Sequence, residues 1–198
     1  PVYGGNPPSI GEGYVFDGWD KELSKLDVPD VYYYTAKYIT EEDAALERLL
    51  CFTAVGSSAS VWYENFNGNS PEVLYSTDNG KTWSVLEENT LVELQNAGDK
   101  VYIKGNNPDG FSHERAISRF MMTGQIAASG SLMSLIDGEG LAKKIPNSNC
   151  FDSLFIRCGS LVQAPELTAT ELTRECYREM FRYCSNLREA PQLPATTV

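Results

Sequence analysis

The sequence has a single histidine, His113, and this scarcity excludes most catalytic sites that depend on an imidazole. A Ser-His-Asp or Cys-His site would have to use His113, whose neighbours Ser112 and Glu114 adjoin it in sequence, whereas triads join distant segments. No phosphate loop or dinucleotide fingerprint occurs. Asp and Glu are plentiful, so a paired-carboxylate glycosidase stays open, although no pair stands out. We therefore expect a non-enzyme without catalytic residues or a cofactor, with His113 in a surface loop.

Metal-ligand patterns are also scarce. No Cys-x-x-Cys pair occurs, and with one histidine a zinc site is disfavoured. Asp109, with Asn106 and Asn107 nearby, offers oxygen ligands for a weak Ca²⁺ site, which is the alternative to a plain loop. We predict no metal site.

Basic residues are in deficit. Lys and Arg number 16 against 27 Asp and Glu, so the net charge is -11. Nucleic acid and anionic membrane surfaces are thus disfavoured as partners, because both attract clustered Lys and Arg. The acidity is uneven: residues 150–198 hold six acidic and five basic side chains, whereas residues 1–50 hold ten and four. No apolar run of transmembrane length and no signal peptide are present.

The five cysteines are an odd number, so they cannot all form disulfides within one chain. One lies at Cys51 and the other four lie in a repeated segment described below. Buried free thiols are the favoured interpretation, because free cysteine is among the most buried residue types. Disulfides that join Cys150 to Cys176 or Cys158 to Cys184 are the alternative.

A repeat of about 26 residues occupies the end of the chain, where residues 150–172 match residues 176–198. Periods of this length are typical of stacked solenoid units that bury their apolar faces against one another. The shared framework positions are Cys150, Phe155, Cys158, Leu161 and Pro165, which match Cys176, Phe181, Cys184, Leu187 and Pro191.

The spacing within each copy predicts a short helix followed by a turn and a strand. In residues 150–158 and 176–184 the apolar positions fall within an arc of about 140° on a helix. Asp152, Ser153, Arg157, Arg178, Glu179 and Arg182 then lie on a solvated opposite face. The prolines Pro165, Pro191 and Pro194 end the helix and favour extended backbone.

These residues resemble the leucine-rich repeats of the BspA type, which occur in surface proteins of gut and oral bacteria. The resemblance covers the last quarter of the chain and departs from the pattern at Thr168, where the second copy has Pro194. It implies an α/β solenoid fragment that serves as a binding surface. We expect the preceding domain to cover one end of the array and the other end to be bare.

A second resemblance lies near the start of the chain. Gly13, Tyr14, Phe16, Gly18 and Trp19, then Tyr34, Ala36 and Tyr38, resemble the core of the Listeria-Bacteroides repeat, a small β-grasp-like module of secreted bacterial proteins. The alternating aromatic residues predict strands, and we assign residues 1–40 to a partial module of this kind. Aromatic residues that form a sugar platform are a less favoured interpretation than core packing.

Residues 41–149 contain a short acidic helix or linker over 41–50 and then about seven extended runs separated by turn signals. These runs predict an antiparallel β-sandwich. The segment Ser76-Thr77-Asp78-Asn79-Gly80-Lys81-Thr82-Trp83 matches the Asp-box of sialidase propellers, which is a structural hairpin rather than a catalytic motif. A single copy does not make a propeller.

The sequence thus predicts a mainly β, multi-module chain: residues 1–40, a sandwich over 41–149, and two leucine-rich repeats over 150–198. We expect a fragment of a longer bacterial protein, extracellular or at the cell surface and anchored in the outer membrane. It would bind a host or bacterial surface protein or glycan through its repeats. The weak candidates for contact residues are Val162, Gln163, Arg188 and Glu189, which follow the framework leucines.

Two alternatives stay open. The sandwich could be a carbohydrate-binding module, which would need an exposed aromatic platform from Trp62, Tyr63, Phe66, Tyr75 or Trp83. Alternatively, the chain could be only a spacer for further repeats.

Overall fold

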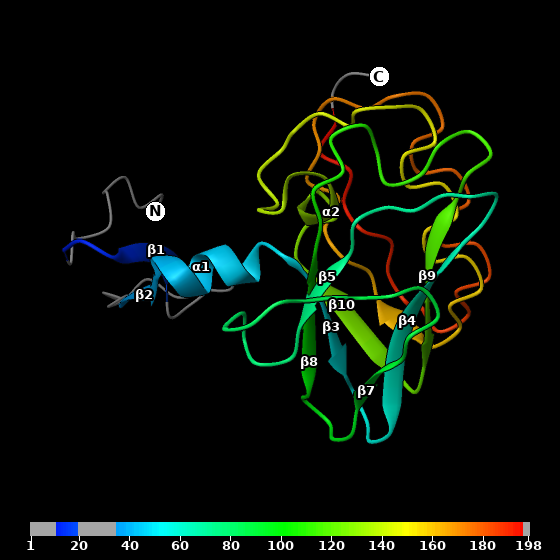
Figure 1. The fold of residues 1–198 in the computed structure, drawn as a ribbon. Coiled ribbons are helices and arrows are strands. Elements are labelled where there is room, and N and C mark those ends of the chain that lie inside the picture. Colours follow the sequence, from blue (N-terminus) through cyan, green and yellow to red (C-terminus); the bar gives the residue numbers. More distant parts are fainter. Residues whose placement is uncertain (1–10, 20–34, 196–198) are drawn as a thin grey trace, which may run out of the picture. The chain divides into compact units, whose positions relative to one another are not determined.

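The computed structural model describes residues 11–19 and 35–195, and it confirms that the chain is mainly β, with several sheets, none closed. The chain divides into two compact units, Pro1–Ala45 and Leu46–Val198. The predicted boundary at residue 150 lies inside the second unit (Figure 1).

The first unit contains an antiparallel pair of strands, β1 (Tyr14–Trp19) and β2 (Ala36–Thr40), in which a bulge falls between Phe16 and Gly18. The Phe16 ring contacts Trp19 and Tyr38 edge-on, at centroid distances of 5.3 and 5.9 Å. These are the aromatic positions that predicted the strands. Tyr34, which belongs to the same motif, lies outside the described residues.

Helix α1 (Glu41–Glu47) follows β2 directly, within the predicted segment 41–50. Thr40 begins it, because its Oγ1 accepts a hydrogen bond from the Asp43 backbone N–H at 3.0 Å and donates to the Asp43 carboxylate at 2.7 Å. Thr40 is therefore the N-cap residue, and the acidic first turn faces the positive end of the helix dipole.

The second unit contains two sheets, the short helix α2 (Ser134–Asp137) and the repeated segment. The larger sheet has the order β11-β10-β3-β8-β5-β6, and all its pairs are antiparallel except β10 with β11. Its strands are β3 (Leu50–Ala54), β5 (Leu74–Ser76), β6 (Ser84–Val85), β8 (Lys100–Lys104), β10 (Ile126–Ser129) and β11 (Leu161–Gln163). The smaller sheet comprises β7 (Val92–Leu94), β4 (Ala59–Asn65) and β9 (Ser118–Thr123).

The core lies where the two sheets meet. Alternation along β9 buries Phe120 and Met122 and leaves Arg119 and Met121 only partly covered. The Phe120 ring then packs against Phe52 of β3 at 5.2 Å. Buried side chains of both sheets and of the repeated segment belong to this one cluster.

The predicted helices over 150–158 and 176–184 are wrong, because both segments are chains of consecutive turns. Every fourth residue has a positive φ, with values of 58° at Ser153, 64° at Arg157, 51° at Glu179 and 65° at Tyr183. An α-helix does not tolerate such residues. The apolar positions recur every four residues, and over nine residues this period is hard to tell from the 3.6 of a helix.

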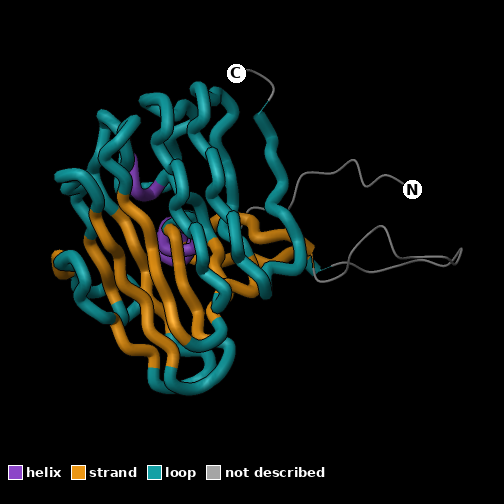
Figure 2. Tube along the Cα trace, turned by 90° about the vertical axis from the view of Figure 1, so that its right-hand side faces the viewer, coloured by secondary structure: helices purple, strands orange, loops and turns teal. Residues whose placement is uncertain are grey.

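The two copies of the repeat stack in register. Backbone N–H groups of the first copy (residues 147–172) donate to carbonyls of the second (residues 173–198), for example Phe151 to Cys176 at 2.8 Å and Phe155 to Met180 at 3.0 Å. The Phe155 and Phe181 rings lie 5.7 Å apart and nearly parallel. Figure 2 shows the turns of the two copies running side by side next to the strands.

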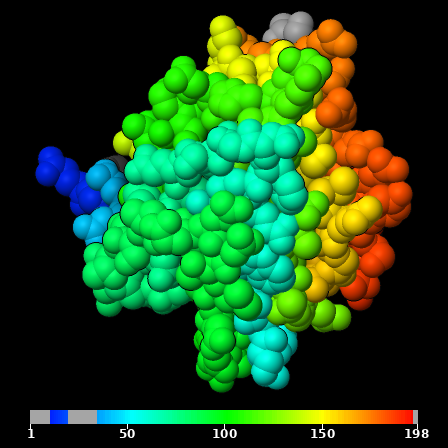
Figure 3. Space-filling view, turned by 45° about the vertical axis from the view of Figure 1, so that its right-hand side comes forward, coloured from blue at the N-terminus to red at the C-terminus, as the bar shows by residue number. Residues whose placement is uncertain are grey.

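The first copy is fixed in turn to the sheets. The backbone N–H groups of Ser112 and Phe120 donate to the carbonyls of Cys150 and Leu154, at 2.9 and 2.8 Å. The Phe120 ring stacks on Phe155 at 6.1 Å. A column of rings therefore runs from the sheets through both copies, and the second copy forms the outer layer (Figure 3).

We predict that Phe155→Ala destabilises the protein by ~3–5 kcal/mol, because it empties a fully buried position in the middle of this column. Urea unfolding followed by far-UV circular dichroism would measure the loss. Phe181→Ala is the matched control and should cost clearly less, because Phe181 is only half-buried. Equal losses would contradict a column anchored at the sheets.

Candidate binding surface

The predicted framework residues point into the core. Seven of the ten are buried: Cys150, Phe155, Cys158, Leu161, Pro165, Cys176 and Cys184. The other three, Phe181, Leu187 and Pro191, belong to the second copy and are half-buried. Side chains that pack inward in this way cannot contact a partner, which leaves the positions between them.

The four predicted contact residues form what we call the strand-side surface: Val162, Gln163, Arg188 and Glu189. The first two lie on the edge strand β11, and the other two occupy the equivalent positions of the second copy. The Asn186 amide donates to the Gly159 carbonyl just before these segments, at 2.5 Å. Three of the four are exposed and Val162 is half-buried. Within the described residues, none of these side chains makes a hydrogen bond or an ion pair.

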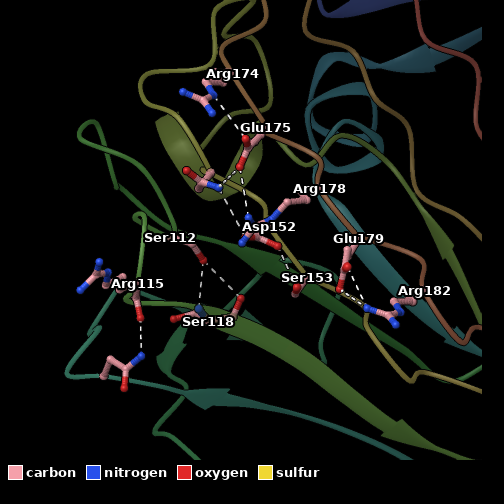
Figure 4. Close-up of polar contacts among 12 residues, drawn as sticks. Ser112, Arg115, Ser118, Asp152, Ser153, Arg174, Glu175, Arg178, Glu179 and Arg182 are labelled. Carbon is pink, nitrogen blue, oxygen red and sulfur yellow. Dashed lines mark hydrogen bonds and ion pairs between the residues drawn. The ribbon is translucent and has the colours of Figure 1, made fainter.

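A second surface, which we call the turn-side surface, comprises the residues predicted to form a solvated face together with two charged neighbours: Asp152, Ser153, Arg157, Arg178, Glu179 and Arg182, with Arg174 and Glu175. For Asp152 the prediction of a solvated position is wrong. Asp152 is fully buried, and its carboxylate accepts hydrogen bonds from Nε and Nη2 of Arg178, at 3.0 and 2.5 Å (Figure 4). The two residues occupy equivalent positions in the two copies, 26 residues apart. Opposite charges at one repeat position were the signal in the sequence, and they join the copies.

Most of the other charges of the turn side also pair with one another, whereas Arg157 lies over the Tyr183 ring at 6.0 Å. Arg178 and Arg174 both contact Glu175, at 3.1 and 3.2 Å, and Arg182 contacts Glu179 at 2.8 Å. A cavity of about 400 Å³ opens beside them, and its walls combine Arg115, Arg174 and Arg178 with Glu114 and Glu175. The pairing holds the pKa values of the Arg178 and Arg182 guanidinium groups above the ordinary range, through hydrogen bonds to Asp152 and Glu179 respectively. This surface is largely neutralised from within.

All five cysteines are free and buried. The thiols of Cys158 and Cys184 donate to the carbonyls of Phe120 and Phe155, each at 3.0 Å, so each thiol bonds to the layer before it. Burial raises the pKa of the Cys150 thiol to about 12 and raises that of Cys158 further. The side chains act as small apolar groups that also satisfy backbone acceptors.

The five rings proposed for a sugar platform do not form an open, flat surface. Tyr63 is buried, and Trp62, Tyr75 and Trp83 are partly buried. Phe66 is exposed, but the Arg119 guanidinium lies over its ring at 4.5 Å. Lys104 lies over Trp83 at 4.1 Å.

The Asp-box segment forms a hydrogen-bonded loop after β5. The Asp78 carboxylate accepts from the Thr82 hydroxyl and backbone N–H, at 2.7 and 3.0 Å, and these bonds lower the pKa of Asp78 to about 2. Trp83 donates to the Gly80 carbonyl at 3.1 Å. Gly80 has a φ of 77°, as the turn requires. The polar groups of the Asp-box segment thus bond to one another, as in a structural hairpin.

His113 is exposed, and its Nδ1 lies 2.8 Å from the Asn147 amide. The Asn107 amide accepts from the Glu72 backbone N–H and donates to the carbonyls of Glu72 and Leu135. The Asn107 oxygen that was considered as a Ca²⁺ ligand therefore already accepts a hydrogen bond. In the described part of the chain, no group of three or more His, Cys, Asp and Glu side chains could hold a metal ion.

Three comparisons with known proteins found no match to this chain: no family model, no curated protein and no solved structure is similar to it. Among residues 11–19 and 35–195, no helix has the length and apolar character needed to cross a membrane.

We predict that Arg178→Met destabilises the protein by ~1–3 kcal/mol, because it leaves the buried Asp152 carboxylate without its charged donor. The upper end of the range for fully buried pairs is not reached, since Arg178 is half-exposed. The control Arg182→Met breaks an exposed pair, which solvent screens, and should cost clearly less. Urea unfolding of both variants is the measurement, and indistinguishable losses would contradict a structural role for Asp152.

A thiol titration should label fewer than one cysteine promptly in the native protein and all five after unfolding in guanidinium chloride. The reason is that burial both blocks the reagent and raises the thiol pKa, so little thiolate is present at pH 8. Cys184, which is 9% exposed, should react first. Prompt native labelling of four or five thiols would contradict the buried arrangement.

Proposed function

We propose that this chain is a non-enzymatic binding module of a bacterial surface protein, in which a BspA-type leucine-rich repeat array presents contacts to a macromolecular partner. The observation that carries the proposal is the contrast between the two surfaces of the repeats. Turn-side charges other than Arg157 pair with one another, whereas strand-side side chains have no polar partner among the described residues.

The contrast matters because binding to a partner requires groups that are free to form new bonds. A guanidinium that already bonds to a carboxylate must break that bond before it contacts a ligand, and this cost reduces affinity. Gln163, Arg188 and Glu189 have no such bond to break. They offer an amide, a cation and an anion at equivalent positions of the two copies.

The chemistry of the strand-side surface favours a neutral or mixed-charge partner. Arg188 and Glu189 cancel in charge, so this patch does not share the acidity of the rest of the chain. Polar hydrogen-bonding groups beside the short apolar side chain of Val162 are typical of contacts to a protein or a glycan. A host or bacterial surface protein or glycan therefore remains our proposed partner class, with the protein at the cell surface or outside the cell.

The test compares two variants of the full chain. The strand-side variant combines Val162→Ala, Gln163→Ala, Arg188→Ala and Glu189→Ala, and the turn-side control combines Arg174→Ala and Arg182→Ala. Fluorescently labelled proteins would be applied to a glycan array and, by flow cytometry, to panels of bacterial and epithelial cells. We expect wild-type binding to at least one target, a loss of at least ~10-fold in the strand-side variant, and no loss in the control.

Other outcomes favour the alternatives. Glycan binding that is lost in Phe66→Ala and kept in the strand-side variant would favour a carbohydrate-binding module in the sheets. No binding to any target would favour a spacer. Urea unfolding of each variant would ensure that any loss of binding is not a loss of folding.

A further inference from the structure

The backbone-to-backbone hydrogen bonds between the two copies all run in one direction. In the first copy, alternate N–H groups donate to carbonyls of the second copy, at distances of 2.8–3.1 Å: Asn149 to Arg174, Phe151 to Cys176, Ser153 to Arg178, Phe155 to Met180 and Arg157 to Arg182. Among the described residues, no carbonyl of the first copy accepts from a backbone N–H group of the second, although the Thr173, Cys184 and Asn186 side chains do donate to first-copy carbonyls. The backbone ladder is therefore directional, with donors in the first copy and acceptors in the second.

The same groups of the second copy lack acceptors. The carbonyls of the second copy that do not accept from the first copy accept instead from N–H groups within their own turns, as in the bond from the Arg178 N–H to the Glu175 carbonyl. Five alternate N–H groups, those of Glu175, Tyr177, Glu179, Phe181 and Tyr183, are left without an acceptor among the described residues, and we call the last four of them the open edge. The open edge contains donors only.

An apolar groove of about 310 Å³ accompanies the open edge. Its lining includes Leu167, Tyr177, Met180, Phe181 and Leu193. Phe181 and Tyr177 each stack one ring face on the first copy, on Phe155 and Phe151. The Tyr177 hydroxyl is buried and has no hydrogen-bond partner among the described residues.

Equivalent residues of the two copies show what a cover would bury. Leu167 is 7% exposed and its counterpart Leu193 is 54% exposed, and Phe155 is buried whereas Phe181 is only half-buried. The second copy makes this difference, since it lies on the donor side of the first. The matching surface of the second copy has no such layer among the described residues.

We propose that the open edge and its groove form a docking surface for a further unit of the same 26-residue pattern, which covers it when the same polypeptide carries one. Such a unit presents its carbonyls in one direction and a ring at the positions of Tyr177 and Phe181. Continuity with the existing interface carries the choice of occupant. The proposal is independent of the strand-side surface.

The polarity of the edge also excludes two other occupants. A second copy of this chain cannot pair through the same surface, because N–H groups would face N–H groups. The carbonyls of the first copy that could accept from such donors already accept from Ser112 and Phe120 of the same chain. An ordinary β-strand alternates donors and acceptors along its edge, so half of its groups would oppose donors. The surface thus selects a unit of its own kind.

The test appends a second copy of residues 173–198 directly after Val198, and its control appends the same 26 residues in scrambled order. Amide hydrogen exchange by NMR would be measured at Tyr177, Glu179, Phe181 and Tyr183. We expect exchange at least ~10-fold slower than in the control, together with a higher midpoint of thermal unfolding. Exchange at the control rate would overturn the proposal.

The unmodified chain provides a second measurement that does not depend on the folding of an added unit. Its four open-edge amides should exchange faster than their counterparts at Phe151, Ser153, Phe155 and Arg157, and it should be monomeric by light scattering at micromolar concentration. Equal protection in the two copies, or a dimer that protects the open edge, would overturn the proposal.

Discussion

The one-way ladder of backbone hydrogen bonds between the two copies is the constraint on which the rest of the repeat region depends. It requires alternate peptide groups to point in opposite directions along the stack, and the residues of positive φ every fourth position accompany this arrangement. Once the backbone is arranged in this way, equivalent side chains of the two copies lie in register. The parallel contact of Phe155 with Phe181 and the bond of Arg178 to Asp152 both follow from that register.

The sheets complete the ladder on its other side. Ser112 and Phe120 donate to the first copy much as the first copy donates to the second, and the Cys158 thiol adds a bond to the Phe120 carbonyl. The Phe52, Phe120 and Phe155 rings then join sheet and repeat in a single core. The repeats are distinct in sequence, but they share one core with the sheets and do not form a separate domain.

The sequence pattern predicted the inward-facing framework and the β-rich character, because apolar periodicity reports directly which side chains are buried. It did not predict the turns. Six residues of the turn segments have positive φ, and only Asn149 is of a type that favours this conformation: the others are Ser153, Arg157, Glu175, Glu179 and Tyr183. Stacking against the neighbouring copy, rather than local preference, accounts for their backbone. The same dependence on a neighbour explains Asp152, whose burial requires Arg178 from the other copy.

The coverage of the first copy by Ser112 and Phe120 has a consequence for the order of folding. A ribosome releases the sheet segments before the first copy and the first copy before the second, so each layer meets a completed donor edge as it emerges. A layer whose partner is synthesised earlier does not have to wait for a distant part of the chain. Folding of this region is therefore matched to the direction of translation, with the sheets as its template.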